Sequence, residues 1–142
     1  MRNLLTACIS LFVFAASVVA QENDGFTIEA MPPSVVKTVP QAGQTDVHPS
    51  LDQIRVTFSK DMLTDRMWSV VQVSKEHFPK VRKDAKGVHY LDDKRTCVIP
   101  VDLEAGQTYV VWFNQGRYNS FRDTLNHPAV PYLLVFRTAK AK

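Results

Sequence analysis

The segment QIRVTFSKDM, residues 53–62, begins with six residues in which polar and apolar side chains alternate strictly. Because successive side chains of a strand point to opposite faces, Ile54, Val56 and Phe58 share one face and the polar residues share the other. A strand of this kind packs one face against a core and exposes the other to water. The three polar residues at 59–61 either form a chemical site or mark the end of the strand.

The same periodicity recurs along the chain and predicts an all-β fold. Further strands are expected at 35–39, 68–73, 88–91, 96–101, 109–114 and 132–138. Seven short strands in about a hundred residues are typical of an Ig-like antiparallel β-sandwich. The residues at 92–95 predict a compact hairpin loop. No window shows a convincing helical face, although 61–67 allows a single helical turn.

The N-terminus predicts a targeting segment. Arg2 is followed by an uncharged, mostly apolar run over 4–20 that ends in small residues. This pattern predicts a secretory signal peptide at 1–20 with cleavage before Gln21. Since no basic stop-transfer cluster follows, we expect no transmembrane segment after cleavage and a location in the periplasm, on the cell surface or outside the cell.

A competing pattern lies inside this leader. Leu5-Thr6-Ala7-Cys8 resembles the lipobox at which bacterial lipoprotein precursors are cut and acylated. Most of the apolar run follows the cysteine, whereas a lipobox requires the run to precede it. We therefore do not expect a lipid anchor on Cys8.

The remaining chain has the length of one domain. Residues 21–34, QENDGFTIEAMPPS, predict a flexible lead-in, and 35–142 form the domain. Loss of the leader removes one of the 17 basic residues, which face 14 acidic ones, so the net charge is about +2. The one basic cluster, at 80–86, is much weaker than the basic blocks of nucleic-acid-binding tails, so we interpret it as a solvated loop and expect no nucleic-acid partner.

Cys97 is the cysteine that remains once the leader is removed, so the mature chain has no internal disulfide. An exported protein with a single cysteine either buries the thiol or exposes it to another molecule. Cys97 begins the apolar run Cys97-Val98-Ile99, which favours burial in a strand over an intermolecular disulfide.

The segment LEAGQTY, residues 103–109, has the spacing of a tyrosine corner. In that arrangement Gly106 allows a tight turn, and Tyr109 at the start of the next strand bonds its hydroxyl to upstream backbone. We therefore expect Tyr109 to be structural and not catalytic.

These segments together resemble the SbsA-type bacterial Ig-like domains first associated with S-layer proteins. The resemblance rests on VVKTVPQAGQTDVHPSLDQIRVTFSKDM (35–62), LEAGQTYVVWF (103–113) and VFRT (135–138). Members often carry an Asp-x-x-Gly-Asn turn before the last strand, and Asp123-Thr124-Leu125-Asn126 lacks the glycine. Such domains also usually occur in tandem or in larger surface proteins, whereas this sequence has one copy.

The resemblance implies a noncatalytic, exported interaction or scaffold module of the bacterial cell envelope, whose partner is an envelope protein or a glycan. It places Phe58, Met62, Gly106 and Tyr109 among the structural signature residues. It implies no cofactor.

The sequence shows no catalytic or metal-binding signature. A Gly-x-Ser-x-Gly elbow and a His-Glu-x-x-His zinc pair are both absent. The four histidines are scattered singly, at 48, 77, 89 and 127. We therefore expect no catalytic residues and no metal site, which makes a small hydrolase the least favoured reading.

The segment from Trp112 to Phe121 mixes aromatic rings with amides at a strand end and in the following loop. If Tyr109 faces the core, Trp112 faces the opposite way. An exposed Trp112 would offer a stacking platform, making a carbohydrate-binding accessory module the alternative function. The predicted ligand-binding residues are Trp112, Asn114, Arg117, Tyr118 and Asn119. The other interpretation is that Trp112 packs under a neighbouring loop or strand.

The opening segment is then best interpreted as the end of a core strand. Met62 is suited to fold back over the end of the sheet, and Asp61 to bond nearby backbone in the turn. Lys60 is interpreted as a solvated charge whose replacement by alanine changes stability by less than about 0.5 kcal/mol.

Overall fold

The protein, a computed structural model, is described over residues 25–83 and 86–141. The predicted signal peptide and Cys8 lie outside these residues. The strands are β1 (Val35–Val39), β2 (Gln53–Phe58), β3 (Val70–Gln72), β4 (Lys80–Val81), β5 (His89–Tyr90), β6 (Thr96–Asp102), β7 (Thr108–Phe113) and β8 (Tyr132–Arg137). The described chain is all-β, and the single helical turn allowed at 61–67 does not form there.

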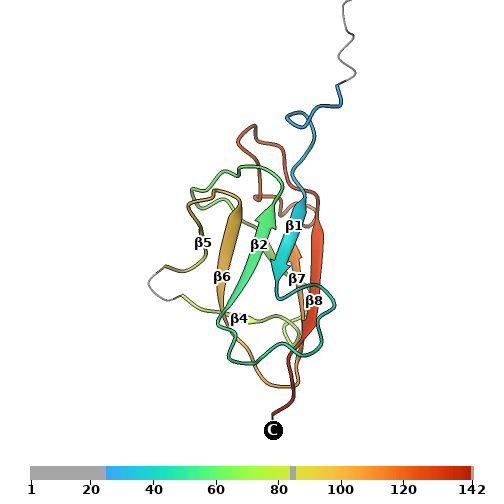
Figure 1. Ribbon diagram of the computed structural model, residues 1–142, viewed down its shortest axis with the longest axis vertical. Coiled ribbons are helices and arrows are strands. Elements are labelled where there is room, and N and C mark those ends of the chain that lie inside the picture. The colour runs from blue at the N-terminus through green and yellow to red at the C-terminus, as the bar shows by residue number, and fades with distance from the viewer. Residues whose placement is uncertain (1–24, 84–85, 142) are drawn as a thin grey trace, which may run out of the picture.

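Two antiparallel sheets form the predicted sandwich (Figure 1). In one sheet β1 pairs with β2, β2 pairs with β6, and both β4 and β5 pair with β6. The other sheet has the order β3-β7-β8. Between the sheets lie the side chains predicted from the alternation, with Ile54, Val56 and Phe58 at most 1% exposed.

Aromatic rings join the two sheets at the end of the sandwich where β2 and β7 finish. The Phe58 ring lies 5.0 Å, centroid to centroid, from Phe121 in the loop after β7. Phe121 in turn contacts Phe113 edge-on at 5.9 Å. Met62 is 2% exposed and belongs to the same core. Burial of these side chains supplies the hydrophobic driving force that fixes the loop 114–131 on the sandwich.

The tyrosine corner forms as predicted. The backbone N–H of Glu104 donates a 2.8 Å hydrogen bond to the Tyr109 hydroxyl. Gly106 has a φ of +70°, a conformation that glycine adopts without steric cost. Because Tyr109 is 4% exposed and its hydroxyl is bonded, this residue holds the turn before β7.

Two predictions made from short segments are wrong. Part of the basic cluster forms strand β4, in which Lys80 pairs with Asp102 and Val81 with Val101. Lys80 also places its Nζ 3.0 Å from the Asp102 carboxylate. Trp68 does not open a strand, since β3 begins only at Val70.

The turn at 123–127 shows how the chain replaces the glycine common in this turn. The N–H of Asn126 donates to the carbonyl of Asp123 at 2.9 Å, and the N–H of Asp123 donates to the carbonyl of His127 at 3.0 Å. Asn126 adopts a φ of +70°. Asparagine is one of the few residues other than glycine that visits this region readily, so the turn keeps its shape.

Candidate functional site

A groove runs along one edge of the sandwich, between the β3 side of one sheet and the β5 side of the other. It consists of two adjoining hollows of about 520 and 470 Å³ that share Trp68 and Val88. We call these two hollows the edge groove. Its open shape suits a ligand that lies along the surface.

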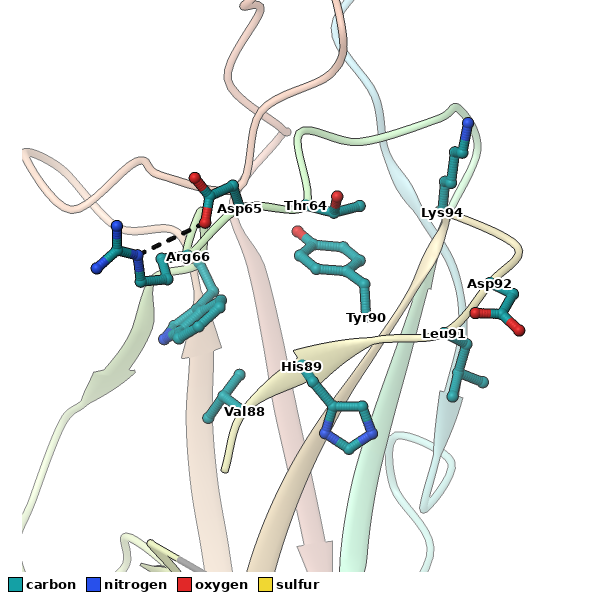
Figure 2. Close-up of a pocket in the computed structure, with 10 residues that line it drawn as sticks. Thr64, Asp65, Arg66, Val88, His89, Tyr90, Leu91, Asp92 and Lys94 are labelled. Carbon is teal, nitrogen blue, oxygen red and sulfur yellow. Dashed lines mark ion pairs between the residues drawn. The ribbon is translucent and has the colours of Figure 1, made fainter. Parts of the chain in front are cut away.

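The first hollow is bounded by the loop at 64–66 and by the hairpin that carries β5 (Figure 2). Figure 2 shows Tyr90 directed towards Thr64, whereas His89 points away from that loop. The Tyr90 hydroxyl donates a 2.9 Å hydrogen bond to the carbonyl of Met67, which fastens the loop to β5. Burial, with a smaller contribution from Cys97, raises the pKa of Tyr90, so its hydroxyl stays protonated and serves as a donor.

Charged side chains of both signs stand at the rim of this hollow. Asp65 and Arg66 form an exposed ion pair at 3.5 Å, and Asp92 and Lys94 line the opposite wall. Donors and acceptors beside the indole of Trp68 provide the mixture of stacking and hydrogen bonding that polar ring-containing ligands require.

The second hollow opens between the sheets and is closed by the loop after β7. Val70, Val81 and Ile99 form its apolar walls, and Tyr118 lies at its border. The N–H of Ser120 donates to the Ser69 hydroxyl at 2.9 Å, which places this loop against the residues that follow Trp68. Tyr118, 50 residues from Trp68 in sequence, therefore lines the same groove.

Arg117 and Tyr118 act as one unit at the tip of this loop. The Arg117 guanidinium lies 5.0 Å from the centroid of the Tyr118 ring. It also donates a 3.0 Å hydrogen bond to the Tyr118 hydroxyl. Since Tyr118 is 50% exposed, the pair presents a flat, cationic surface to solvent.

The two predicted asparagines line one hollow of about 500 Å³, but they differ in burial. Asn114 is 1% exposed, and its amide donates 3.0 Å hydrogen bonds to the carbonyls of Phe121 and Ala129. Its Oδ1 accepts a further bond from the N–H of Phe121 at 3.0 Å, so the side chain of Asn114 is committed to holding the loop. Asn119 is half-buried and accepts a 2.8 Å bond from Arg122.

Trp112 does not line the edge groove. Its strand register places it between Val71 of β3 and Leu133 of β8, on the outer face of that sheet. The side chain is half-buried and turned away from the core, as the alternation along the strand predicts. The fold therefore brings Arg117 and Tyr118 together and places Trp112 elsewhere.

Lys60 of the opening segment forms a buried ion pair, which corrects its interpretation as a solvated charge. Its Nζ lies 3.0 Å from the carboxylate of Asp123, and the two side chains are 13% and 2% exposed. Lys60 also donates to the carbonyls of Glu29, at 3.0 Å, and Met31. It therefore fastens the segment before β1 to the turn before β8.

Asp61 was expected to bond nearby backbone, but its side chain accepts a hydrogen bond from Arg95 at 2.7 Å.

Asp123 accepts hydrogen bonds from several directions. Its Oδ1 accepts from the N–H groups of Leu125 and His127, at 3.0 and 2.8 Å, and its Oδ2 accepts from Lys60 and from Nδ1 of His127. Burial by itself would raise the pKa of Asp123, but the bonds from Lys60 and His127 outweigh it and hold the pKa below its usual value. The carboxylate is thus ionised and fully occupied by the fold.

The remaining predictions concern the thiol of Cys97, metal ligands and membrane spans. Cys97 is buried, as expected, and burial raises the pKa of its thiol. Within 25–83 and 86–141, no group of three or more His, Cys, Asp or Glu side chains could hold a metal ion. The described part of the chain also contains no helix that is long and apolar enough to cross a membrane.

Comparison with known proteins places the chain in a family. The N-terminal part of the bacterial S-layer protein SbsC is similar over 80% of this chain and 25% of its own length, with 18% identity and a TM-score of 0.49. A structure of surface layer protein SbsC, domains 1-6, is similar over 80% of this chain and 14% of its own length, with 16% identity and a TM-score of 0.47. The chain thus spans a quarter or less of these structures, and no curated protein matches it. A family model described as a bacterial Ig-like domain matches residues 29–138, and the chain therefore belongs to the bacterial Ig-like domain family.

Proposed function

We propose that this chain is a noncatalytic, exported interaction module of the bacterial cell envelope, of the SbsA type. The observation that carries the proposal is the edge groove, an open surface lined by Trp68, Tyr90 and Tyr118. Open grooves with aromatic walls hold a partner by surface contact, which an interaction module requires. Family membership supports the same class of function.

Several polar side chains outside the edge groove form hydrogen bonds within the fold, which is consistent with this proposal. Asp123 is occupied by Lys60 and by the turn that follows it, and the amide of Asn114 is occupied by the loop 114–131. Tyr109 serves the corner before β7. These side chains contribute stability and leave binding to the groove.

A site-specific crosslinking experiment tests the proposal. A photoreactive amino acid replaces Arg66 at the edge groove, and a matched variant carries it at Lys37, an exposed position on β1. In the native host we expect the protein in the envelope or the medium, with a discrete adduct from position 66 and none from 37. A cytoplasmic protein, or equal adducts from both positions, would contradict the proposal.

A carbohydrate ligand is the second candidate, and it is favoured by the composition of the groove. Trp68 and Tyr118 provide ring faces for stacking, while Asp65, Arg66 and Lys94 provide acceptors and donors. This candidate site includes Tyr118 from the predicted segment 112–121. Its stacking surface is Trp68 in place of Trp112. Sugar rings are bound by this pairing of aromatic faces with polar groups.

Glycan binding by three variants distinguishes a site at the edge groove from a site at Trp112. Trp68→Ala and Tyr118→Ala should each weaken binding to an envelope glycan by about tenfold or more, since full burial of a large apolar side chain contributes about 1.5 to 3 kcal/mol. Trp112→Ala, on the outer face of the sheet, should leave binding within about twofold. Loss of binding in Trp112→Ala alone would return the site to the outer face, and no binding by the wild type would remove this candidate.

A further inference from the structure

Strand β3 is an outer strand of its sheet, and it borders the edge groove. The sheet has the order β3-β7-β8, so β3 pairs with β7 along one of its two edges. Val70 and Val71 of this strand line the second hollow of the groove. The backbone of β3 is therefore within reach of a molecule that occupies this hollow.

The hydrogen bonds between β3 and β7 show which backbone groups of β3 face the other way. The N–H of Asn114 donates to the carbonyl of Ser69 at 3.1 Å, and Val71 lies two positions further along the same register. An antiparallel ladder alternates bonded and non-bonded pairs, so Ser69 and Val71 face β7. The N–H and C=O groups of Val70 and Gln72 point away from it. No residue within 25–83 and 86–141 pairs with these four groups.

The outer edge of β8, at the far side of the same sheet, is covered. The N–H of Gly43 donates to the carbonyl of Val135 at 2.7 Å, and the N–H of Val47 donates to the carbonyl of Arg137 at 3.1 Å. Folded proteins protect strand edges with such a cover, or with proline or charged residues on the edge strand. The sequence of β3, Val-Val-Gln, contains neither. Its free edge is thus a template for pairing with another strand.

The hollow beside this edge is apolar. Phe78, Val81, Val88 and Ile99 line it together with β3, and none of the described residues that line it carries a charge. Ile99 is 1% exposed and belongs to the core. Alternate side chains of a strand point to the same face, so a strand added at β3 would bury every second side chain in this hollow.

We propose that the edge groove binds an extended peptide segment of a partner protein, which pairs with the free edge of β3 as a further strand. Val70 and Gln72 are two residues apart, about 6.5 Å along a strand. Their N–H and C=O groups alternate partial positive and partial negative charge at this spacing, and another extended backbone complements that order. In strand addition, main-chain hydrogen bonds provide the affinity and side-chain pockets provide the specificity.

This inference rests on the proposed function, in which the edge groove is the binding surface, and it names the class of partner. The second hollow favours a peptide over a glycan, because it places aliphatic side chains opposite β3. The charged groups that would bond sugar hydroxyls line the first hollow.

Proline substitution tests the free edge while sparing the ladder to β7. Gln72→Pro removes an N–H that points away from β7 and puts a ring carbon in its place, which blocks pairing with a further strand. Gln72→Ala is the matched control, since it removes the same exposed side chain and keeps the N–H. Both variants should melt close to the wild-type temperature, because neither loses a bond to β7.

The variants are compared by crosslinking in the native host. A photoreactive amino acid replaces Tyr118, which lies at the border of the second hollow. We expect a protein adduct whose yield falls about tenfold or more in Gln72→Pro and changes by less than about twofold in Gln72→Ala. An undiminished yield in Gln72→Pro, or a glycan adduct, would overturn the inference.

Crosslinking from position 66 separates this inference from the proposed function. An adduct from 66 without any from 118 would overturn strand addition and leave the interaction module in place. The absence of an adduct from either position would refute both.

A synthetic peptide provides a test that does not depend on the folding of Gln72→Pro. Mass spectrometry identifies the partner segment that carries the crosslink, and its peptide is titrated against the wild-type protein. Alternate residues of an added strand direct their N–H groups to β3. N-methylation should therefore weaken binding about tenfold or more at alternate positions and less than about twofold at those between. Equal effects at successive positions, or no binding by the unmodified peptide, would overturn the proposal.

Discussion

Replacement of Lys60 by alanine removes the donor that joins three parts of the chain. The Nζ bonds the Asp123 carboxylate at 3.0 Å and the carbonyls of Glu29 and Met31. The Lys60 and Asp123 side chains are 13% and 2% exposed, so water cannot readily replace the lost partner. The segment before β1 is also released from the turn at 123–127.

The expected loss of stability follows from these contacts. Removing one partner of a buried ion pair costs about 3 to 5 kcal/mol, because the other charge remains buried. Asp123 keeps the N–H groups of Leu125 and His127 and the Nδ1 of His127 as donors. These offset part of the penalty, so we expect Lys60→Ala to lower the free energy of unfolding by about 2 to 4 kcal/mol.

Urea unfolding followed by tryptophan fluorescence measures this loss. Lys80→Ala is the matched control, since Lys80 Nζ also lies 3.0 Å from a carboxylate, that of Asp102, but the Lys80 side chain is 80% exposed. We expect a change of less than about 0.5 kcal/mol in Lys80→Ala. If Lys60→Ala were no more destabilising than Lys80→Ala, the buried ion pair would not contribute as argued.

The same pair predicts a dependence on pH. The folded protein lowers the pKa of Asp123 despite burial, so ionised Asp123 stabilises the fold above its unfolded pKa of about 3.9. This stability is lost as the pH falls through the lower pKa of the folded state. Asp93, whose pKa is also lowered by bonds from Thr96 and Arg95 that outweigh burial, adds a second contribution. Melting temperatures between about pH 2 and 5 should therefore fall less steeply in Lys60→Ala than in the wild type.

Three further predictions concern the core, the turn and the thiol. Phe58→Ala should lower the free energy of unfolding in urea by about 3 to 5 kcal/mol, because it leaves a cavity beside Phe121; a loss below about 1 kcal/mol would contradict the packing. Asn126→Gly should keep or slightly raise the melting temperature, whereas Asn126→Val should cost about 1 to 2 kcal/mol at a φ of +70°; equal stability of the two variants would argue against that conformation. Cys97 should resist iodoacetamide in the native protein and react in denaturant, and rapid native alkylation, seen by mass spectrometry, would refute its burial.

Much of the fold could be predicted from local pattern. β1 and β2 have the predicted limits, and the other predicted strands differ from the observed ones by one or two residues at one or both ends. The tyrosine corner was predictable as well, since the turn at Gly106 and the bond to Tyr109 join residues five apart or fewer. Strand β4 was missed because it has two residues and lies in a basic segment without alternation.

The candidate site could not be predicted in the same way. Trp112 and Tyr118 were grouped because they are close in sequence, but the strand places Trp112 on the outer face and the loop carries Tyr118 to Trp68. Lys60 was interpreted as solvated because its partner Asp123 is 63 positions away.

The sequence by itself determined that the chain forms short strands with one apolar face, and hence a sandwich, because side-chain direction along a strand follows from backbone geometry alone. Only the tertiary structure decided that a lysine is buried against an aspartate and that the edge groove exists. Each of these features depends on which loops meet when the two sheets pack, and that meeting is set by the topology of the whole chain.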